Sequence, residues 1–256
     1  MKRCAAMFAR EPGVFGAFVM LGDPDLATSA AILEQLVAGG ADMLELGIPF
    51  SDPVADGPVI QAAAERALRA GTTPDDCFAL LAAFRARHAD TPVGILTYAN
   101  LVLGGGRDHF YRRAAAAGVD NVLVADVPLF EAAPYAAAAR AHGVDPVLIA
   151  AANTPPERLR EIAALGGSYT YCVARAGVTG TGETVRFEHA GMLAALRAAG
   201  APPPVFGFGI SQPDHVRAAL AAGAAGAISG SAIVARVAAG QPVADFVAAM
   251  KAATIP

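Results

Sequence analysis

Lysine is scarce in this chain, because Lys2 and Lys251 are the only two and both stand near its ends. A Schiff-base enzyme needs a lysine amine inside its active site. We therefore expect no lysine imine with a carbonyl substrate, and no pyridoxal phosphate (PLP) held covalently within this chain.

Cysteine and histidine are also few. The cysteines are odd in number and far apart, which fits a reducing cytoplasm and shows neither a disulfide nor a metal-binding pattern. The histidines fall in expected helices or loop flanks, never at adjacent strand ends, so a histidine-rich catalytic metal site is not expected. The sequence predicts no metal and no cofactor on this chain. The cysteines are Cys4, Cys77 and Cys172.

Charge is sparse as well, at 16% of residues with a net charge of −4 and no basic block. A nucleic acid or an anionic membrane is therefore not an expected partner. Polar residues follow Lys2 and Arg3 closely, so no signal peptide is predicted and a cytoplasmic location is expected. The one long uncharged run, 218–235, is mostly alanine, glycine and serine, which is too weakly apolar to span a membrane.

Hydrophobic residues, in contrast, make up 55% of the 256 positions, enough for a large core. Short apolar runs alternate with alanine-rich stretches of helical spacing, and several expected helices end in glycine. The expected strands are 14–20, 42–48, 93–98, 121–125, 146–150, 168–174, 204–208 and 226–229. The clearest expected helices are 28–38, 59–70, 74–88, 107–117 and 213–222.

Eight strands alternating with helices predict an α/β fold, a single (β/α)8 TIM barrel over residues 1–256 with an extra N-terminal helix. The main alternative is a doubly wound open sheet. That fold usually has a glycine-rich turn after its first strand, and Leu21-Gly22-Asp23-Pro24 is not one.

The segment LELGIPFSDPVADGP at 44–58 is the most informative stretch. Glu45 lies within an apolar strand, and Asp56 follows in a proline-rich loop. A buried carboxylate is costly, and acid–base chemistry on a substrate is a reason to keep one. The alternatives are an arginine partner or solvent for Glu45, and a helix-capping role for Asp56.

Strand side chains alternate between two faces. Leu44, Leu46 and Ile48 should pack under the helices, which leaves Glu45 and Gly47 pointing into the barrel. Apolar neighbours would raise the pKa of Glu45, as suits a group that gives and takes a proton near neutral pH.

Two glycine-containing loops indicate a phosphate site. GFGIS at 207–211 ends the seventh expected strand, and SGSAI at 229–233 ends the eighth and begins a helix. In TIM barrels phosphates commonly bind at these two loops, on backbone N–H groups at a helix N-terminus. The hydroxyl of Ser231 could add a hydrogen bond. The alternative is a pair of simple tight turns.

Residues 175–182 (RAGVTGTG) follow the sixth expected strand and contain three glycines. We interpret them as a lid whose Thr179 docks on a closed site; the alternative is a surface excursion. Tyr169 and Tyr171 share one face of the preceding strand, where they could line a pocket for a flat aromatic ligand or fill the core.

Several motifs in order resemble the tryptophan synthase alpha subunit family over nearly the whole chain. They are LELGIPFSDPVADGP at 44–58, YANLV at 98–102, VLVADVP at 122–128, YTY at 169–171, RAGVTG at 175–180, GFGIS at 207–211 and GAAGAISGSAIV at 223–234. The resemblance implies a carbon–carbon lyase that cleaves indole-3-glycerol phosphate to indole and glyceraldehyde 3-phosphate. It also implies an α2β2 complex with a PLP-bearing beta subunit, which joins the indole to serine.

The resemblance also implies roles for individual residues. Glu45 would donate the proton to indole C3, Asp56 would interact with the indole N–H, and Tyr171 would lie near the reacting glycerol. Thr179 would close toward Asp56. The expected indole pocket is Phe18, Leu96, Leu123, Phe208 and Ile228, the expected phosphate site is Gly180, Gly209, Gly230 and Ser231, and the expected beta-subunit surface is Pro49, Asp52, Pro53, Asn100, Asp126 and Pro128.

The chain departs from the family pattern at Ala151-Ala152-Asn153, where Pro-Pro-Asn is frequent, at Ala17, where proline is common, and at Ala174, where serine is common. None of these is an expected catalytic group. Three other functions stay open: a free-standing indole-releasing lyase, a non-catalytic activator of a beta subunit, and another phosphate-binding barrel such as a sugar-phosphate isomerase.

Overall fold

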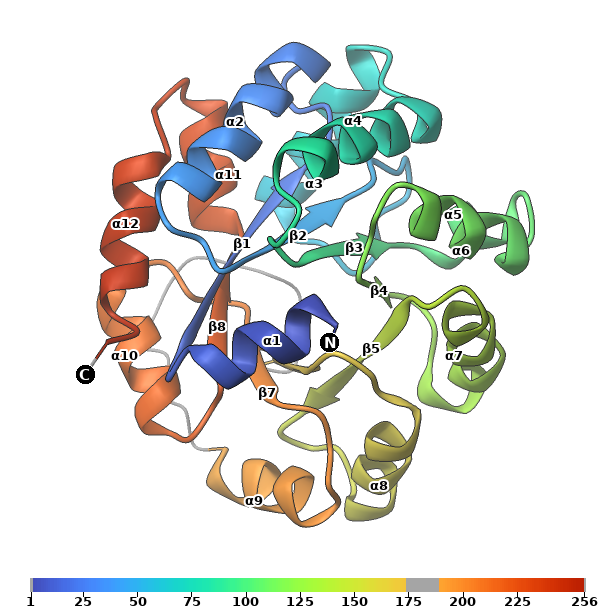
Figure 1. The fold of residues 1–256 in the computed structure, drawn as a ribbon, viewed down its shortest axis with the longest axis vertical. Helices are drawn as coiled ribbons and strands as arrows, with labels where there is room; N and C mark the ends of the chain where they lie inside the picture. Colours follow the sequence, from blue (N-terminus) through green and yellow to red (C-terminus); the bar gives the residue numbers. More distant parts are fainter. Residues whose placement is uncertain (1, 174–188, 256) are drawn as a thin grey trace.

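The computed structural model describes residues 2–173 and 189–255. Eight parallel strands form a closed barrel in the order β1-β2-β3-β4-β5-β6-β7-β8, which confirms the predicted fold (Figure 1). The strands are β1 (Val14–Met20), β2 (Met43–Gly47), β3 (Val93–Thr97), β4 (Asn121–Val124), β5 (Asp145–Ala151), β6 (Thr170–Val173), β7 (Pro204–Gly207) and β8 (Gly226–Ser229).

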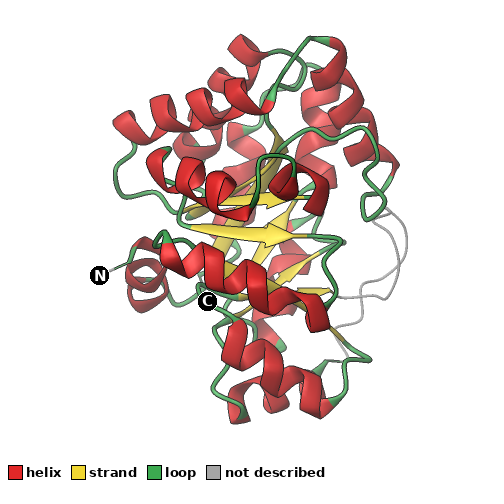
Figure 2. Ribbon diagram, turned by 90° about the vertical axis from the view of Figure 1, so that its right-hand side faces the viewer, coloured by secondary structure: helices red, strands yellow, loops and turns green. Residues whose placement is uncertain are grey.

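Helices surround this barrel, as both ribbon views show (Figures 1 and 2). In the part of the chain described, they are α1 (Arg3–Arg10), α2 (Leu26–Ala38), α3 (Pro58–Arg69), α4 (Pro74–Arg87), α5 (Ala99–Leu103), α6 (Arg107–Ala116), η1 (Leu129–Glu131), α7 (Ala132–Ala141), α8 (Pro156–Leu165), α9 (Ala190–Ala198), α10 (Pro213–Ala221), α11 (Ser231–Ala238) and α12 (Ala244–Ala252). The expected extra N-terminal helix is α1. No helix within the described ranges is long and apolar enough to cross a membrane.

The segments 99–106 and 126–130, which follow β3 and β4, contain short helical turns. Helix α5 occupies most of the first, and the turn η1 begins in the second. The Asp126 carboxylate accepts a hydrogen bond of 2.7 Å from the backbone N–H of Ala99, at the start of α5. This contact joins residues 27 positions apart, so no local pattern could indicate it.

The predicted alternation along β2 is confirmed. Leu44, Leu46 and Ile48 belong to the apolar cluster between the barrel and its helices. Met43 belongs to a second cluster inside the barrel, together with Phe18. Both faces of the sheet are therefore buried, which explains why the strands read as continuous apolar runs.

The parallel register brings the strand ends that matter for function to one end of the barrel. Glu45 stands opposite Phe18 of β1 and Gly94 of β3, and Gly47 stands opposite Met20 and Leu96. The loops after the strands emerge at this C-terminal end, and α1 lies across the N-terminal ends (Figures 1 and 2).

Candidate active site

Glu45 is a buried carboxyl group whose partner is a hydroxyl group. Its side chain is 2% exposed, and Oε1 accepts a hydrogen bond of 2.8 Å from the hydroxyl of Tyr169. The pKa of Glu45 is raised to about 7: burial is the main cause, the Tyr169 hydrogen bond partly opposes it, and the nearby Asp56 carboxylate adds to it. In the described structure no arginine pairs with Glu45, so the carboxyl group can exchange a proton near neutral pH.

Asp56 has the same kind of partner. Its Oδ2 accepts a hydrogen bond of 2.8 Å from the Tyr98 hydroxyl, whose oxygen accepts one of 3.3 Å from the backbone N–H of Ala55. Burial raises the pKa of Asp56, and the Tyr98 hydrogen bond lowers it. The helix-capping alternative is wrong, because Gly57 is the N-cap of α3 and makes no side-chain cap.

Tyr171 packs against Gly207 of β7, a residue without a side chain. A Cβ at Gly207 of β7 would lie 1.9 Å from the Tyr171 hydroxyl oxygen, so only glycine fits there. Burial raises the pKa of Tyr171 well above its usual range, and the carboxylates of Glu45 and Asp56 raise it further. The phenol therefore keeps its proton and can act only as a neutral hydrogen-bonding group.

The residues expected to bind indole gather inside the barrel. Phe18, Leu123 and Ile228 are buried in the inner cluster that contains Tyr171, and Leu96 and Phe208 pack against it, partly exposed. Phe208 has φ 67°, the one left-handed non-glycine residue in the described chain, and its ring meets Tyr171 edge to face at 6.0 Å. Strained residues of this kind tend to occur at functional sites.

The loops after β7 and β8 lie together, as a shared phosphate site requires. The Ser229 hydroxyl donates a hydrogen bond of 2.6 Å to the carbonyl of Ile210 and joins them. Gly230 is the N-cap of α11, and no side chain caps the backbone N–H groups there. Ser231 is the first residue of that helix, and Gly209 is exposed in the loop after β7. A Cβ atom at Gly230 would lie 3.4 Å from the side chain of Phe18.

The residues expected to meet a beta subunit differ in exposure. Asp52, Asn100, Asp126 and Pro128 are exposed and Pro53 is half-buried, whereas Pro49 is buried and offers no surface in this structure. Large apolar side chains lie exposed within or beside the same loops, namely Val54 (73%), Leu103 (45%) and Phe130 (72%).

Thr179, Gly180 and the rest of the expected lid lie outside the described residues, as does the departure at Ala174. Ala151 and Ala152 are described, and Ala151 donates a backbone hydrogen bond of 2.9 Å to the Thr154 hydroxyl. Within residues 2–173 and 189–255 no group of three His, Cys, Asp or Glu side chains could hold a metal ion.

The sequence analysis missed the partners of the two carboxyl groups. Tyr98 begins the YANLV motif, directly after β3, and was not considered as a functional residue. Tyr169 was considered only as a pocket or core residue. The barrel order was the signal that could have found them, because it predicts which strand ends face each other across the interior.

Comparison with known proteins agrees with this geometry. The profile of the family described as "Tryptophan synthase alpha chain" matches residues 5–254. A tryptophan synthase alpha chain of Shewanella amazonensis is 52% identical, covering 99% of this chain and 100% of that protein. One of Aeromonas hydrophila is 56% identical, covering 91% of this chain and 89% of that protein.

Solved structures agree as well. Tryptophan synthase of Mycobacterium tuberculosis matches with a TM-score of 0.89 at 29% identity, covering 99% of this chain and 98% of that one. The tryptophan synthase a2b2 complex of Pyrococcus furiosus matches with a TM-score of 0.84 at 33% identity, covering 94% and 99%. Family profile, relatives and structures coincide over nearly the whole length, so this chain belongs to the tryptophan synthase alpha chain family.

Proposed function

We propose that Glu45, Asp56 and Tyr171 carry out the reaction of this family in the present chain. The chain is a carbon–carbon lyase of tryptophan biosynthesis that cleaves indole-3-glycerol phosphate to indole and glyceraldehyde 3-phosphate. The observation that carries the proposal is the Glu45 carboxyl group, which is 2% exposed, bonded to a hydroxyl group and raised in pKa to about 7.

Cleavage of this substrate requires two proton transfers. Indole is a poor leaving group until its C3 atom gains a proton, and Glu45 supplies that proton. The C3–carbon bond then breaks as the neighbouring substrate hydroxyl group loses its proton and becomes the aldehyde of glyceraldehyde 3-phosphate. A carboxyl group with a pKa near neutrality serves both transfers, and one such group contributes roughly 10²–10⁴-fold to a rate.

Asp56 and Tyr171 act on the two halves of the substrate. As the indole ring is protonated, its N–H becomes more acidic, and the Asp56 carboxylate accepts a hydrogen bond from it. Tyr171 keeps its proton because its pKa is well above the usual range, so it orients the glycerol by hydrogen bonding alone.

Binding uses the apolar interior and the two joined loops. The indole ring lies among Phe18, Leu96, Leu123, Phe208 and Ile228. The phosphate binds at Gly180, Gly209, Gly230 and Ser231, and the lid residue Thr179 closes toward Asp56. A remote anchor fixes the reacting end, and orientation of this kind contributes at best on the order of 7–11 kcal/mol.

The beta subunit is the partner of this family, as in the a2b2 complex of Pyrococcus furiosus. We place its docking surface at Asp52, Pro53, Asn100, Asp126 and Pro128, with Pro49 supporting the loop from within. The exposed apolar side chains of Val54, Leu103 and Phe130 beside them favour this surface. PLP belongs to the beta subunit, and the present chain needs no cofactor of its own. Residues 1–256 form one domain. The complex works in the cytoplasm.

The test is indole release from indole-3-glycerol phosphate by the purified chain, with and without a beta subunit. Wild type should release indole slowly alone and much faster with the partner. Glu45→Gln should lose release by about 10²-fold or more in both states while its circular dichroism stays native. Unchanged release in Glu45→Gln would contradict the mechanism, and fast release that ignores the partner would identify a free-standing lyase.

A further inference from the structure

We propose that α1 seals the N-terminal end of the barrel, and that Lys2 and Arg3 are positioning residues which, through this seal, keep water away from Glu45. The N-terminal end of the strands is called the floor below. The inference deepens the proposed function, because it depends on the role assigned to Glu45.

Two side chains of α1 face the barrel. Cys4 and Met7 are 2% and 1% exposed, although the helix crosses the outside of the floor (Figure 1). Met7 belongs to the inner apolar cluster that also contains Tyr169. Burial and Glu45 are the main causes that raise the pKa of the Tyr169 hydroxyl, and the Cys4 thiol makes a small contribution in the same direction. The helix therefore packs against the same apolar interior that contains Tyr169, the hydrogen-bond partner of Glu45.

A second path of contacts runs from α1 to the strand beside Glu45. The Sγ atom of Cys4 accepts a hydrogen bond of 3.5 Å from Nδ2 of Asn121, the first residue of β4. Asn121 stands opposite Gly94 of β3, and Gly94 stands opposite Glu45. A Cβ at Gly94 would lie 2.4 Å from Oδ1 of Asn121, so the amide fills the space left by that glycine.

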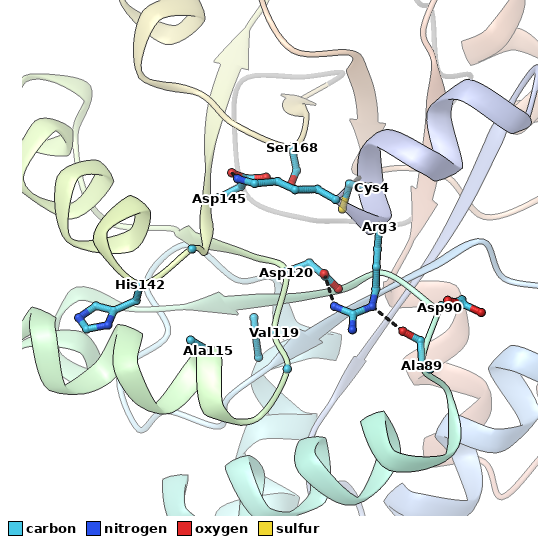
Figure 3. Close-up of a pocket in the computed structure, with 13 residues that line it drawn as sticks. Arg3, Cys4, Ala89, Asp90, Ala115, Val119, Asp120, His142, Asp145 and Ser168 are labelled. Atoms are coloured by element: carbon cyan, nitrogen blue, oxygen red, sulfur yellow. Dashed lines mark hydrogen bonds and ion pairs between the residues drawn. The ribbon is translucent and has the colours of Figure 1, made fainter.

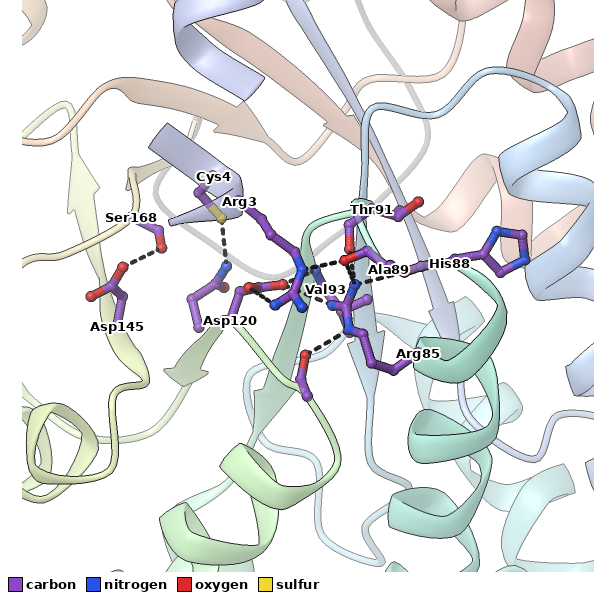
Figure 4. Close-up of polar contacts among 12 residues, drawn as sticks. Arg3, Cys4, Arg85, His88, Ala89, Thr91, Val93, Asp120, Asp145 and Ser168 are labelled. Atoms are coloured by element: carbon purple, nitrogen blue, oxygen red, sulfur yellow. Dashed lines mark hydrogen bonds and ion pairs between the residues drawn. The ribbon is translucent and has the colours of Figure 1, made fainter. Parts of the chain in front are cut away.

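Ion pairs fasten the first turn of α1 to the floor. Lys2 pairs with Asp145 at the start of β5. Nη1 of Arg3 lies 2.9 Å from Oδ1 of Asp120, just before β4, and its Nε donates to the carbonyl of Ala89 (Figure 4). Asp120 is itself fixed, because its Oδ2 accepts bonds of 2.9 Å from Arg85 and 2.8 Å from the backbone N–H of Val93.

Water has access to the other side of this turn. A cavity of about 650 Å³ opens beside Lys2, Arg3 and Cys4 (Figure 3). Cys4 lines that cavity, is itself 2% exposed and accepts the hydrogen bond from Asn121 of β4, so its side chain lies between the cavity and the strands of the barrel. Closure of the floor at this point therefore depends on the fastening of α1.

The consequence for Glu45 follows from its environment. Burial is the largest cause of its raised pKa, so a loosened α1 that admits water should bring that pKa back toward its ordinary value. The other titratable groups acting on it are Asp56 from the loop after β2 and Tyr169 immediately before β6, while Cys4 of α1 acts on Tyr169. Substitutions at Lys2 and Arg3 remove none of these side chains.

The experiment compares the double variant Lys2→Ala/Arg3→Ala with Arg87→Ala. Arg87 is a matched control, because it also makes a 2.9 Å ion pair, with Glu34, and ends α4 on the floor side without contacting α1. One readout is the rate at which iodoacetamide labels Cys4, followed by peptide mass spectrometry, with the buried Cys77 and Cys172 as internal references. The other is the pH profile of indole release.

In the double variant, Cys4 should be labelled about tenfold faster or more, because its local opening becomes easier. The limb of the pH profile that Glu45→Gln abolishes should move by about one pH unit to lower pH. Arg87→Ala should change neither, and Arg3→Lys should restore most of both values. Arg3→Ala alone serves the same comparison should the double variant fail to fold.

Faster labelling of Cys4 with an unmoved limb would overturn the proposal, because the seal would then have no bearing on Glu45. Unchanged labelling in the double variant would overturn it too, since the ion pairs would not be what fastens α1. Failure of the proposed function looks different: Glu45→Gln would then leave the pH profile intact, whatever the labelling of Cys4.

Discussion

The two ends of the barrel use carboxylates in different ways. On the floor, Asp145 pairs with Lys2, Asp120 pairs with Arg3 and Arg85, and the Asp42 carboxylate lies 2.8 Å from Nζ of Lys251. At the opposite end, Glu45 and Asp56 accept hydrogen bonds from Tyr169 and Tyr98 instead. Across the ranges that the structure describes, no lysine or arginine pairs with either of them.

The carboxylates differ in the residue that they pair with, and this partner is not determined by the end of the barrel at which the carboxylate lies. Asp23 follows β1 at the same end as Glu45 and is also 2% exposed, yet Arg66 contacts both of its oxygens at 2.7 and 2.8 Å. A cation favours the charged form of a buried carboxylate more than a hydroxyl group does, and at Asp42 the Lys251 ammonium opposes the rise in pKa that burial causes without cancelling it. Burial combined with a hydroxyl partner is therefore what distinguishes the two carboxyl groups assigned to catalysis.

The largest expected effect is on activity at the hydroxyl-paired end. Asp56→Asn removes the charge that stabilises the protonated indole, so indole release should fall roughly 10²–10⁴-fold. The side chain keeps its size and can still bond to Tyr98, so the thermal midpoint should stay near that of wild type. Steady-state kinetics and thermal unfolding of the same preparation test this, and a variant that unfolds instead of losing activity would make Asp56 a structural residue.

The next effect is on stability at the cation-paired end. Arg85→Ala removes a side chain that is 12% exposed and pairs with the equally buried Asp120, so unfolding should become easier by about 3–5 kcal/mol. The rate per folded molecule at the optimum pH should remain within a few-fold of wild type. Urea unfolding measures the first quantity, with the half-exposed Arg87→Ala expected to cost less than about 1 kcal/mol. Equal losses in the two variants would remove the distinction between buried and surface pairs.

A third effect concerns stability and pH at Glu45. Its folded pKa of about 7 exceeds the ordinary 4.5, so the folded protein binds more protons than the unfolded chain between these values. Stability due to Glu45 is complete below pH 4.5 and is lost as pH rises through about 7, by about 3 kcal/mol. Glu45→Gln should escape this loss, so its stability relative to wild type should rise with pH. A constant difference in urea unfolding across this range would mean that the carboxyl group is not desolvated.

The smallest expected effect distinguishes the roles of Tyr169 and Tyr98. Tyr169→Phe removes the hydrogen bond that lowers the pKa of Glu45, so the limb of the pH profile due to Glu45 should move to higher pH. Tyr98→Phe removes the bond to Asp56 and should leave that limb in place. Each variant should lose about 1 kcal/mol of stability. The pH profiles of both variants, measured side by side, decide whether each tyrosine serves its own carboxyl group.

The fold and part of the site could be predicted because their signals are local. The alternation of strands and helices predicted the barrel. The alternation of side chains between the two faces of β2 predicted that Glu45 points into the barrel. The hydroxyl partners could not be predicted in this way, since Tyr98 is 42 residues from Asp56 and Tyr169 is 124 residues from Glu45. Burial of Pro49 likewise depends on how its loop folds back, which the residue type does not reveal.

Closure of the sheet has a consequence for association. Val14 to Ala17 of β1 pair with β8, so the eight strands leave no free edge. A partner protein cannot extend this sheet by adding a strand, so it must bind to loops and helix ends instead. The loop after β2 carries exposed Val54 two residues before Asp56. A partner that docks there would contact the backbone that holds Asp56, so the proposed docking surface and a proposed catalytic carboxylate share one short piece of chain.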